Sequence, residues 1–265
     1  MRLRYLFLSV LLIFAWQCRV VKAQAEAGIG SVIRISGFNH LKEPVLATAF
    51  LVQASGKGPR QAWLITAAHV FRQIAGEKVE LLLRRHRQGR IQAFSQAYQI
   101  RKGGQDLFFV DRQFDMAAFL LELPSDCSCS LFSPSILAQE QDFLRYQAGV
   151  GSKLLVYGFP YGESYDQTGN CIVRSAIISS SPLLPAAAYP DFLADFEVFA
   201  GYSGAPVLLE RDGKAIIVGM VLEEVFIEEL RSQAKKVLRT RHGLGLARVL
   251  NSIHVKNFIE ALHLH

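Results

Sequence analysis

Short runs of apolar residues, separated by turn-forming residues, recur along most of the chain. The runs occupy residues 47–52, 63–71, 79–83, 154–157, 172–179 and 215–222. Ser55-Gly56-Lys57-Gly58-Pro59 has the composition of a hairpin connection between the first two runs, and Gln88-Gly89-Arg90 resembles another turn. Many short strands at this spacing are typical of β-barrels or sandwiches. The pattern therefore predicts an all-β fold.

Two segments have helical spacing instead. Near the C-terminus, Asn251 and Ser252 offer N-cap chemistry before an apolar stripe of Val255, Phe258, Ile259 and Leu262. Residues 224–239 place a second stripe at Ile227, Leu230, Ala234 and Val237. The first pattern predicts a C-terminal helix, and the second predicts a helical insertion between two strands of the second half.

The predicted insertion carries a basic face opposite its apolar stripe. This face consists of Arg231, Lys235, Lys236, Arg239 and Arg241. A solvated face on an amphipathic helix is the simpler interpretation. The alternative is a docking surface for an acidic partner or an anionic membrane.

The chain divides where apolar strands give way to Ser, Pro, Asp and Cys, near residues 124–141. We therefore expect two units, residues 26–130 and residues 131–265. Residues 1–25 have the pattern of an export signal, with Arg2 and Arg4, an apolar stretch over 5–16 and a small-residue cleavage site at Ala23-Gln24-Ala25. The pattern predicts a secreted or periplasmic protein.

The apolar stretch is too short to span a bilayer comfortably, so we expect no stable membrane span after cleavage. An uncleaved anchor is the alternative, while a lipid anchor at Cys18 is disfavoured by the bulky Gln17 before it. Cleavage after Ala25 leaves 240 residues and lowers the formal charge from +6 to +2, because the removed segment contains four basic residues and no acidic ones. Charge alone therefore gives little support to nucleic-acid binding.

Three cysteines remain in the mature chain: Cys127, Cys129 and Cys171. An odd number in an exported protein leaves one free thiol or one intermolecular bond. Cys171 could pair with either of the other two, and the sequence does not distinguish them. A metal site at Cys127-Ser128-Cys129 would lack a second pair of ligands, so no metal is predicted.

The most informative local motif is Gly201-Tyr202-Ser203-Gly204. A serine hydroxyl needs a neighbouring base, and the oxyanion formed by its attack needs hydrogen-bond donors. The glycine two positions before Ser203 lets a tight turn direct the N–H groups of Gly201 and Ser203 at one point. His69 follows an apolar strand, and Asp115 opens another, whereas Asp106 and Asp111 lie outside any apolar run.

The chain order His69, Asp115, Ser203 is that of chymotrypsin-type triads. With the segments 48–52, 64–70, 115–117, 158–162 and 201–204 in the expected order, the chain resembles the trypsin-like serine peptidases, in the style of their bacterial exported members. The resemblance implies a chymotrypsin-like double β-barrel with a C-terminal helix, in which His69 and Asp115 face Ser203 across a cleft. It also implies an endopeptidase that cleaves proteins or peptides through an acyl-enzyme, without metal or cofactor.

The resemblance extends to substrate selection. Glu197 stands at the position that commonly floors the specificity pocket, and a carboxylate there would favour Lys or Arg. A surface glutamate is the alternative. Gly219 and Met220 would lie near the pocket wall. Tyr202 replaces a small or acidic residue, so its ring is expected to narrow the cleft.

Two other function classes compete with the endopeptidase. A catalytically silent relative that acts as a binding module would keep the same residues without a formed oxyanion site. An esterase would share the chemistry, but the order Ser, Asp, His of the α/β-hydrolases is not found.

Overall fold

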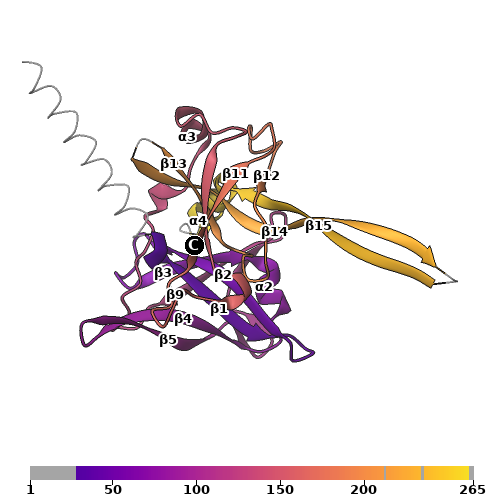
Figure 1. The fold of residues 1–265 in the computed structure, drawn as a ribbon. Helices are drawn as coiled ribbons and strands as arrows, with labels where there is room; N and C mark the ends of the chain where they lie inside the picture. Colours follow the sequence, from indigo (N-terminus) through magenta and orange to yellow (C-terminus); the bar gives the residue numbers. More distant parts are fainter. Residues whose placement is uncertain (1–27, 212, 234–235, 263–265) are drawn as a thin grey trace, which may run out of the picture.

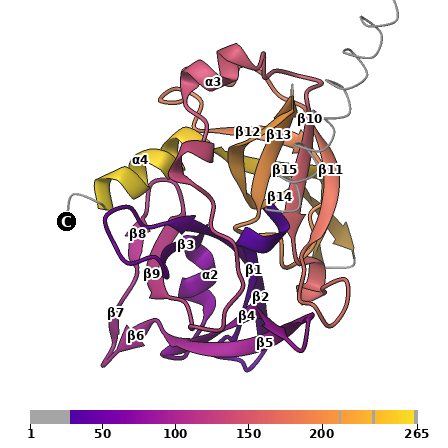
Figure 2. The ribbon, with the colours of Figure 1, turned by 90° about the vertical axis from the view of Figure 1, so that its left-hand side faces the viewer.

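The computed structural model describes residues 28–211, 213–233 and 236–262. The predicted export signal therefore lies outside the described residues. The described chain forms two β units joined by a connecting segment (Figures 1 and 2). Among the described residues, no helix is both long enough and apolar enough to cross a membrane.

The first unit is a seven-stranded sheet with the order β5-β4-β1-β2-β3-β9-β8. Its strands are β1 (Val32–Phe38), β2 (Pro44–Gln53), β3 (Gln61–Ala67), β4 (Lys78–Arg87), β5 (Arg90–Gln99), β8 (Phe109–Asp111) and β9 (Met116–Glu122). The short helix α2 (Ala68–Gln73) follows β3, and the pair β6 (Arg101–Lys102) and β7 (Gln105–Asp106) precedes β8.

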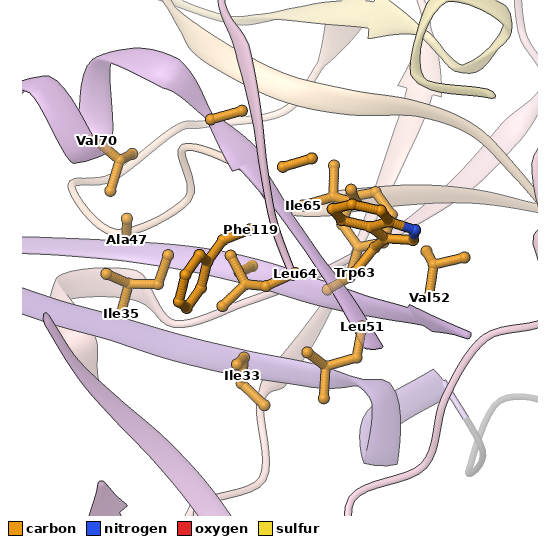
Figure 3. Close-up of a cluster of buried hydrophobic side chains, with 14 of the residues drawn as sticks. Ile33, Ile35, Ala47, Leu51, Val52, Trp63, Leu64, Ile65, Val70 and Phe119 are labelled. Atoms are coloured by element: carbon orange, nitrogen blue, oxygen red, sulfur yellow. The ribbon is translucent and has the colours of Figure 1, made fainter. Parts of the chain in front are cut away.

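Apolar side chains of this sheet form a buried core. Ile33, Ile35, Leu51 and Leu64 are fully buried there, and Phe119 packs beside them (Figure 3). The predicted turns are confirmed: β2 joins β3 across the glycine-rich connection, and Gln88 and Gly89 at the β4–β5 turn both have positive φ values, of 52° and 71°. Such backbone angles at both central positions match the twist of a two-residue hairpin.

The second unit is a closed barrel with the order β10-β11-β12-β15-β14-β13. Its strands are β10 (Lys153–Gly158), β11 (Ile172–Ile178), β12 (Asp191–Asp195), β13 (Pro206–Arg211), β14 (Lys214–Gln233) and β15 (Lys236–Asn251). The segment between the units contains η1 (Pro134–Ile136) and α3 (Glu140–Arg145), and η2 (Pro160–Gly162) follows β10. The all-β prediction is confirmed.

The C-terminal helix is also confirmed as α4 (Ser252–Leu262), which packs against β14 and β15. The Asn251 side-chain oxygen accepts the Ile253 N–H at 3.2 Å, which satisfies one of the donors left open at the helix start. Val255 and Ile259 are buried, as the apolar stripe predicted.

The prediction of a helical insertion is wrong. Residues 224–233 and 236–239 belong to the long antiparallel ribbon that β14 and β15 form as they leave the barrel (Figure 1). β14 and β15 pair with each other from Gly219 opposite Asn251 to Gln233 opposite Lys236. The register shifts between Val221 and Glu223 and again between Val225 and Phe226. Pairing with β15 therefore overrides the local helical spacing.

Four of the basic residues predicted on a helical face lie instead on the two strands of the ribbon: Arg231, Lys236, Arg239 and Arg241. Arg241 pairs with Glu228 at 3.5 Å, and its guanidinium lies 3.5 Å from the centre of the Phe226 ring. Lys235 lies outside the described residues. An acidic partner for this segment stays a prediction.

The predicted cysteine bridge is not formed, because Cys127, Cys129 and Cys171 are all free thiols. The buried guanidinium of Arg84 joins the segments that carry them. It lies 3.9 Å from Cys129 Sγ and donates to the Gly169 carbonyl, two residues before Cys171. It also donates to the Gly30 and Val32 carbonyls. A buried cation is thus held by backbone carbonyls at the place where a disulfide was expected.

Candidate active site

The three predicted triad residues line one cavity of about 500 Å³. His69 lies in the first turn of α2, directly after β3, and Asp115 directly precedes β9. Because β3 and β9 are paired with Ala67 opposite Met116, the two side chains emerge at the same end of the sheet. Ser203 comes from the loop between β12 and β13 of the barrel. The structure therefore brings together residues that are far apart in sequence and belong to both units.

Asp115 orients His69 through two contacts. Its Oδ2 lies 2.6 Å from His69 Nδ1, and its Oδ1 accepts the His69 backbone N–H at 3.1 Å. The Asp115 carbonyl also accepts the Ala68 N–H at 2.8 Å. Asp115 has a positive φ of 50°, an uncommon conformation that these contacts hold in place. With Nδ1 on the carboxylate, Nε2 is the ring nitrogen left to act as a base.

Arg72 is a member of this site that the sequence analysis missed. Its guanidinium contacts Asp115 Oδ1, and its half-exposed side chain lines the same cavity. The available signal was its spacing, because Arg72 follows His69 by three residues on α2 and such residues lie on one helix face.

The Ser203 hydroxyl donates to the Leu222 carbonyl at 3.2 Å. Within the described part of the chain, no hydrogen bond joins Ser203 Oγ to His69. A rotation about the serine Cα–Cβ bond changes the partner of the hydroxyl, and such rotamer changes take picoseconds to nanoseconds at exposed positions.

The loop around Ser203 is fixed through its carbonyl groups. The Ala200 carbonyl accepts the Tyr161 N–H at 2.5 Å, and the Tyr202 carbonyl accepts the Ala205 N–H at 2.8 Å. Each of these carbonyls shares a planar peptide with the N–H of the next residue, Gly201 or Ser203. Those two N–H groups have no protein acceptor among the described residues. Ala200 and Ser203 line the cavity, whereas Gly201 is buried between them, so its role as an oxyanion donor stays a prediction.

Thr48 of β2 is the second member that the sequence analysis did not assign. Its N–H donates to the Ser203 carbonyl at 3.0 Å, and its hydroxyl donates to the Gly201 carbonyl at 2.6 Å. The same hydroxyl accepts the Phe159 N–H at 3.1 Å. The first unit therefore holds the serine loop of the second unit through one buried threonine.

Gly201 and Gly204 permit this close approach. Gly201 has a φ of +102°, and a Cβ there would lie 2.1 Å from the Phe159 carbonyl oxygen. A Cβ on Gly204 would lie 2.2 Å from the Thr48 carbonyl oxygen. Neither position has room for a side chain.

Tyr202 does not narrow the cleft, in contrast to the sequence prediction. Its side chain is fully buried in the barrel core, where it packs edge-on against Phe196 with ring centres 4.8 Å apart. Burial raises the pKa of its phenol above the usual value. Tyr202 thus anchors the serine loop in the core.

The structure does not bring the three predicted specificity residues to the cavity wall. Glu197 has a side chain that is 62% exposed and lies 4.0 Å from Arg174. Gly219 and Met220 are buried in the barrel. The described wall near Ser203 is formed instead by Val198, Phe199, Leu222, Glu223 and Glu224.

Comparison with known proteins supports the fold. No protein-family model and no curated protein matches the sequence. One similar solved structure is that of the Rv3671c protease from M. tuberculosis in its active form, with 18% identity, a TM-score of 0.50 and coverage of 88% of this chain and 81% of that one.

A second similar structure is that of the HtrA-type protease AlgW with a tripeptide. It has 16% identity and a TM-score of 0.50 over 88% of this chain, which spans 60% of the AlgW chain. At these identities the likeness establishes the fold alone. The chain therefore has the chymotrypsin-like fold that these two proteases share.

Proposed function

We propose that this chain is a serine endopeptidase that acts through His69, Asp115 and Ser203. The observation that carries the proposal is their convergence on one cavity, with the imidazole Nδ1 and the Asp115 carboxylate 2.6 Å apart. A fold shared with proteases supports the proposal but does not replace this geometry. Export of the protein is part of the proposal and rests on the sequence pattern of residues 1–25.

In the proposed mechanism, the Ser203 hydroxyl turns from the Leu222 carbonyl to His69 Nε2. His69 takes the hydroxyl proton as Oγ attacks the peptide carbonyl carbon, and Asp115 stabilises the imidazolium that forms. The N–H groups of Gly201 and Ser203 stabilise the oxyanion. His69 then gives its proton to the leaving amine as the C–N bond breaks, and water repeats the sequence on the acyl-enzyme.

A binding module without catalysis is the second candidate. The observation that favours it is the hydrogen bond from Ser203 Oγ to the Leu222 carbonyl, which holds the hydroxyl on an acceptor other than the base. In that case the cavity would bind a peptide segment without cleaving it.

Labelling with a fluorophosphonate probe distinguishes the two candidates, because the probe reacts only with an activated serine. We expect labelling of the wild-type chain and none of Ser203→Ala or His69→Ala. Ser175→Ala is the matched control, because Ser175 is an exposed serine on β11 away from the cavity. Folded protein that remains unlabelled would support the binding module. Cleavage of an unfolded protein such as casein then separates a peptidase from an esterase.

A further inference from the structure

Cys127 and Cys129 lie close together in the segment that connects the two units. The chain turns there: the Cys127 N–H donates to the Pro124 carbonyl at 3.0 Å, and the Cys129 N–H donates to Cys127 Sγ at 3.4 Å. The two thiols are also hydrogen-bonded to each other. Cysteines separated by one residue have Cα atoms no more than about 7 Å apart, so a disulfide between them is within reach.

This segment is fixed on the first unit through its backbone. Cys127 forms an isolated antiparallel bridge with Arg85 of β4, and the Ser128 N–H donates to the Arg84 carbonyl at 2.7 Å. Both thiols of the pair are half-buried, whereas Cys171 is only 5% exposed. A small solute can therefore reach Cys127 and Cys129 more easily than Cys171.

The guanidinium of Arg84 faces Cys129. It is buried, and its Nη2 lies 3.9 Å from Cys129 Sγ. Its other hydrogen bonds go to the backbone carbonyls of Gly30, Val32 and Gly169. In the part of the chain that the structure describes, no carboxylate accepts a hydrogen bond from Arg84. Because a buried cation is costly without an opposite charge, this position favours a thiolate at Cys129.

The same contacts drive the pKa values of the two thiols apart. The hydrogen bond from Cys127 and then the nearby Arg84 lower the pKa of Cys129 to about 6. Donation to Cys129 and burial raise the pKa of Cys127 above its usual value. At neutral pH, Cys129 is therefore the nucleophilic thiolate and Cys127 is its protonated neighbour.

We propose that Cys127 and Cys129 form a redox site, which small-molecule disulfides oxidise reversibly to an intramolecular disulfide. The structure describes the reduced state, in which both cysteines are free thiols. Neither of them lines the Ser203 cavity, so the proposal does not depend on the proposed peptidase function. Export, where it occurs, brings the chain into compartments in which disulfides form and persist.

Oxidation proceeds through a mixed disulfide. The Cys129 thiolate attacks one sulfur of the donor disulfide, whose S–S bond breaks, and the other donor sulfur leaves as a thiolate. Cys129 then has no negative charge to hold the Cys127 proton, so Cys127 loses this proton to solvent and attacks Cys129 Sγ. The second donor thiolate leaves, and both donor thiolates take up protons. The dithiol of the chain is thus oxidised while the donor disulfide is reduced to thiols.

Oxidation should loosen the contact between the two units. A disulfide carries no charge, so Arg84 keeps its carbonyl acceptors but loses the thiolate beside it. Gly169, one of these acceptors, lies in the segment between η2 and β11 of the second unit, so Arg84 links that segment to β4. A disulfide that closes so short a loop constrains the unfolded chain little. The lost charge pair should therefore dominate, and the oxidised form should be the less stable one.

A redox titration of the wild-type chain tests the proposal without any variant. The protein is equilibrated with mixtures of reduced and oxidised glutathione, quenched in acid, alkylated under denaturing conditions and analysed by peptide mass spectrometry. We expect a link between Cys127 and Cys129 that forms and disappears with the glutathione ratio, while Cys171 is alkylated throughout. A disulfide that includes Cys171, or free thiols at every ratio, would overturn the proposal.

Cys127→Ser separates the two steps of the reaction. The attacking thiolate remains but its partner is lost, so oxidised glutathione should leave a mixed disulfide on Cys129. Cys171→Ser is the matched control and should oxidise like wild type. If no mixed disulfide accumulates on Cys129 in Cys127→Ser, the assignment of Cys129 as the attacking thiolate is wrong.

Thermal unfolding of the reduced and oxidised wild-type chain tests the structural consequence. Oxidation should lower Tm by about 2–4 °C, the shift expected for the loss of one modest interaction in a chain of this size. The double variant Cys127→Ser, Cys129→Ser is the control, and its Tm should not change with the glutathione ratio. An equal or higher Tm for the oxidised wild-type chain would contradict the pairing of Arg84 with a Cys129 thiolate.

Discussion

The side chains of Arg72 and His69 bind opposite oxygens of the Asp115 carboxylate. The guanidinium contacts Oδ1, and the imidazole Nδ1 lies 2.6 Å from Oδ2. The Asp115 carboxylate, which is expected to stabilise the imidazolium of His69, therefore also pairs with the permanently charged guanidinium of Arg72. Arg72 on α2 therefore helps to position the carboxylate that orients the proposed base.

Replacement of Arg72 tests that relationship. In Arg72→Gln the Asp115 carboxylate loses the ion pair that helps to hold it against His69, so kcat should fall. The fall should be at most about fivefold, because half-exposed ion pairs are screened by solvent. Gln73→Ala, at a neighbouring cavity residue, is the control and should leave kcat unchanged. An unchanged kcat for Arg72→Gln would show that the arginine only packs beside the site.

Thr48 should matter for turnover although it lies outside the triad. Thr48→Val keeps the shape of the side chain but leaves the Gly201 carbonyl and the Phe159 N–H without their partner. The free energy of unfolding should fall by about 2 kcal/mol, since two buried polar groups lose a hydrogen bond. Turnover should fall more than substrate binding, as the serine loop loses its support. Thr48→Ser, which restores the hydroxyl, should recover turnover, and a failure to do so would contradict this role.

Gly201 should tolerate no side chain. In Gly201→Ala the new methyl group would meet the Phe159 carbonyl, so the loop must move and misplace its N–H groups. We expect kcat to fall by about 10²–10³, the usual cost of one lost oxyanion donor. Gly56→Ala is the control for backbone strain alone, because Gly56 has a φ of +72° with no atom within 4 Å of the added Cβ. Its stability should fall slightly while kcat stays unchanged.

Cys129 should be the most reactive described cysteine. The hydrogen bond from Cys127 and then the nearby Arg84 lower its pKa to about 6, whereas burial raises the pKa of Cys171 to about 12. Iodoacetamide reacts with thiolates, so its rate at Cys129 should be nearly constant above pH 7 and fall below pH 6. Mass spectrometry of the modified peptides measures both rates. Faster modification of Cys171 at pH 7 would contradict this assignment.

The sequence predicted well those features that depend on nearby residues. The strand before His69, the strand after Asp115 and the capped helix after Asn251 each have a local pattern of apolar spacing and turn residues. The convergence of His69, Asp115 and Ser203 was predicted from a resemblance of ordered segments.

Most of the failures depend on distant partners. Residues 224–239 have helical spacing, but β15 supplies a ladder that makes β14 continue as a strand. Thr48 and Gly201 are separated by 153 positions, so no local pattern indicates their hydrogen bond. Tyr202 looked exposed beside a nucleophile, but Phe196 packs against its ring in the core. Arg84 likewise occupies a place where the cysteine count alone suggested a bridge.

The outer part of the ribbon, residues 226–233 and 236–243, is held together by the ladder between β14 and β15. A pair of residues, one in each strand, could be gained or lost there without disturbing the alternation at the base, whereas a single residue would turn every later side chain to the opposite face. The length of the ribbon can therefore diverge during evolution in steps of two residues while the position of Ser203 is conserved.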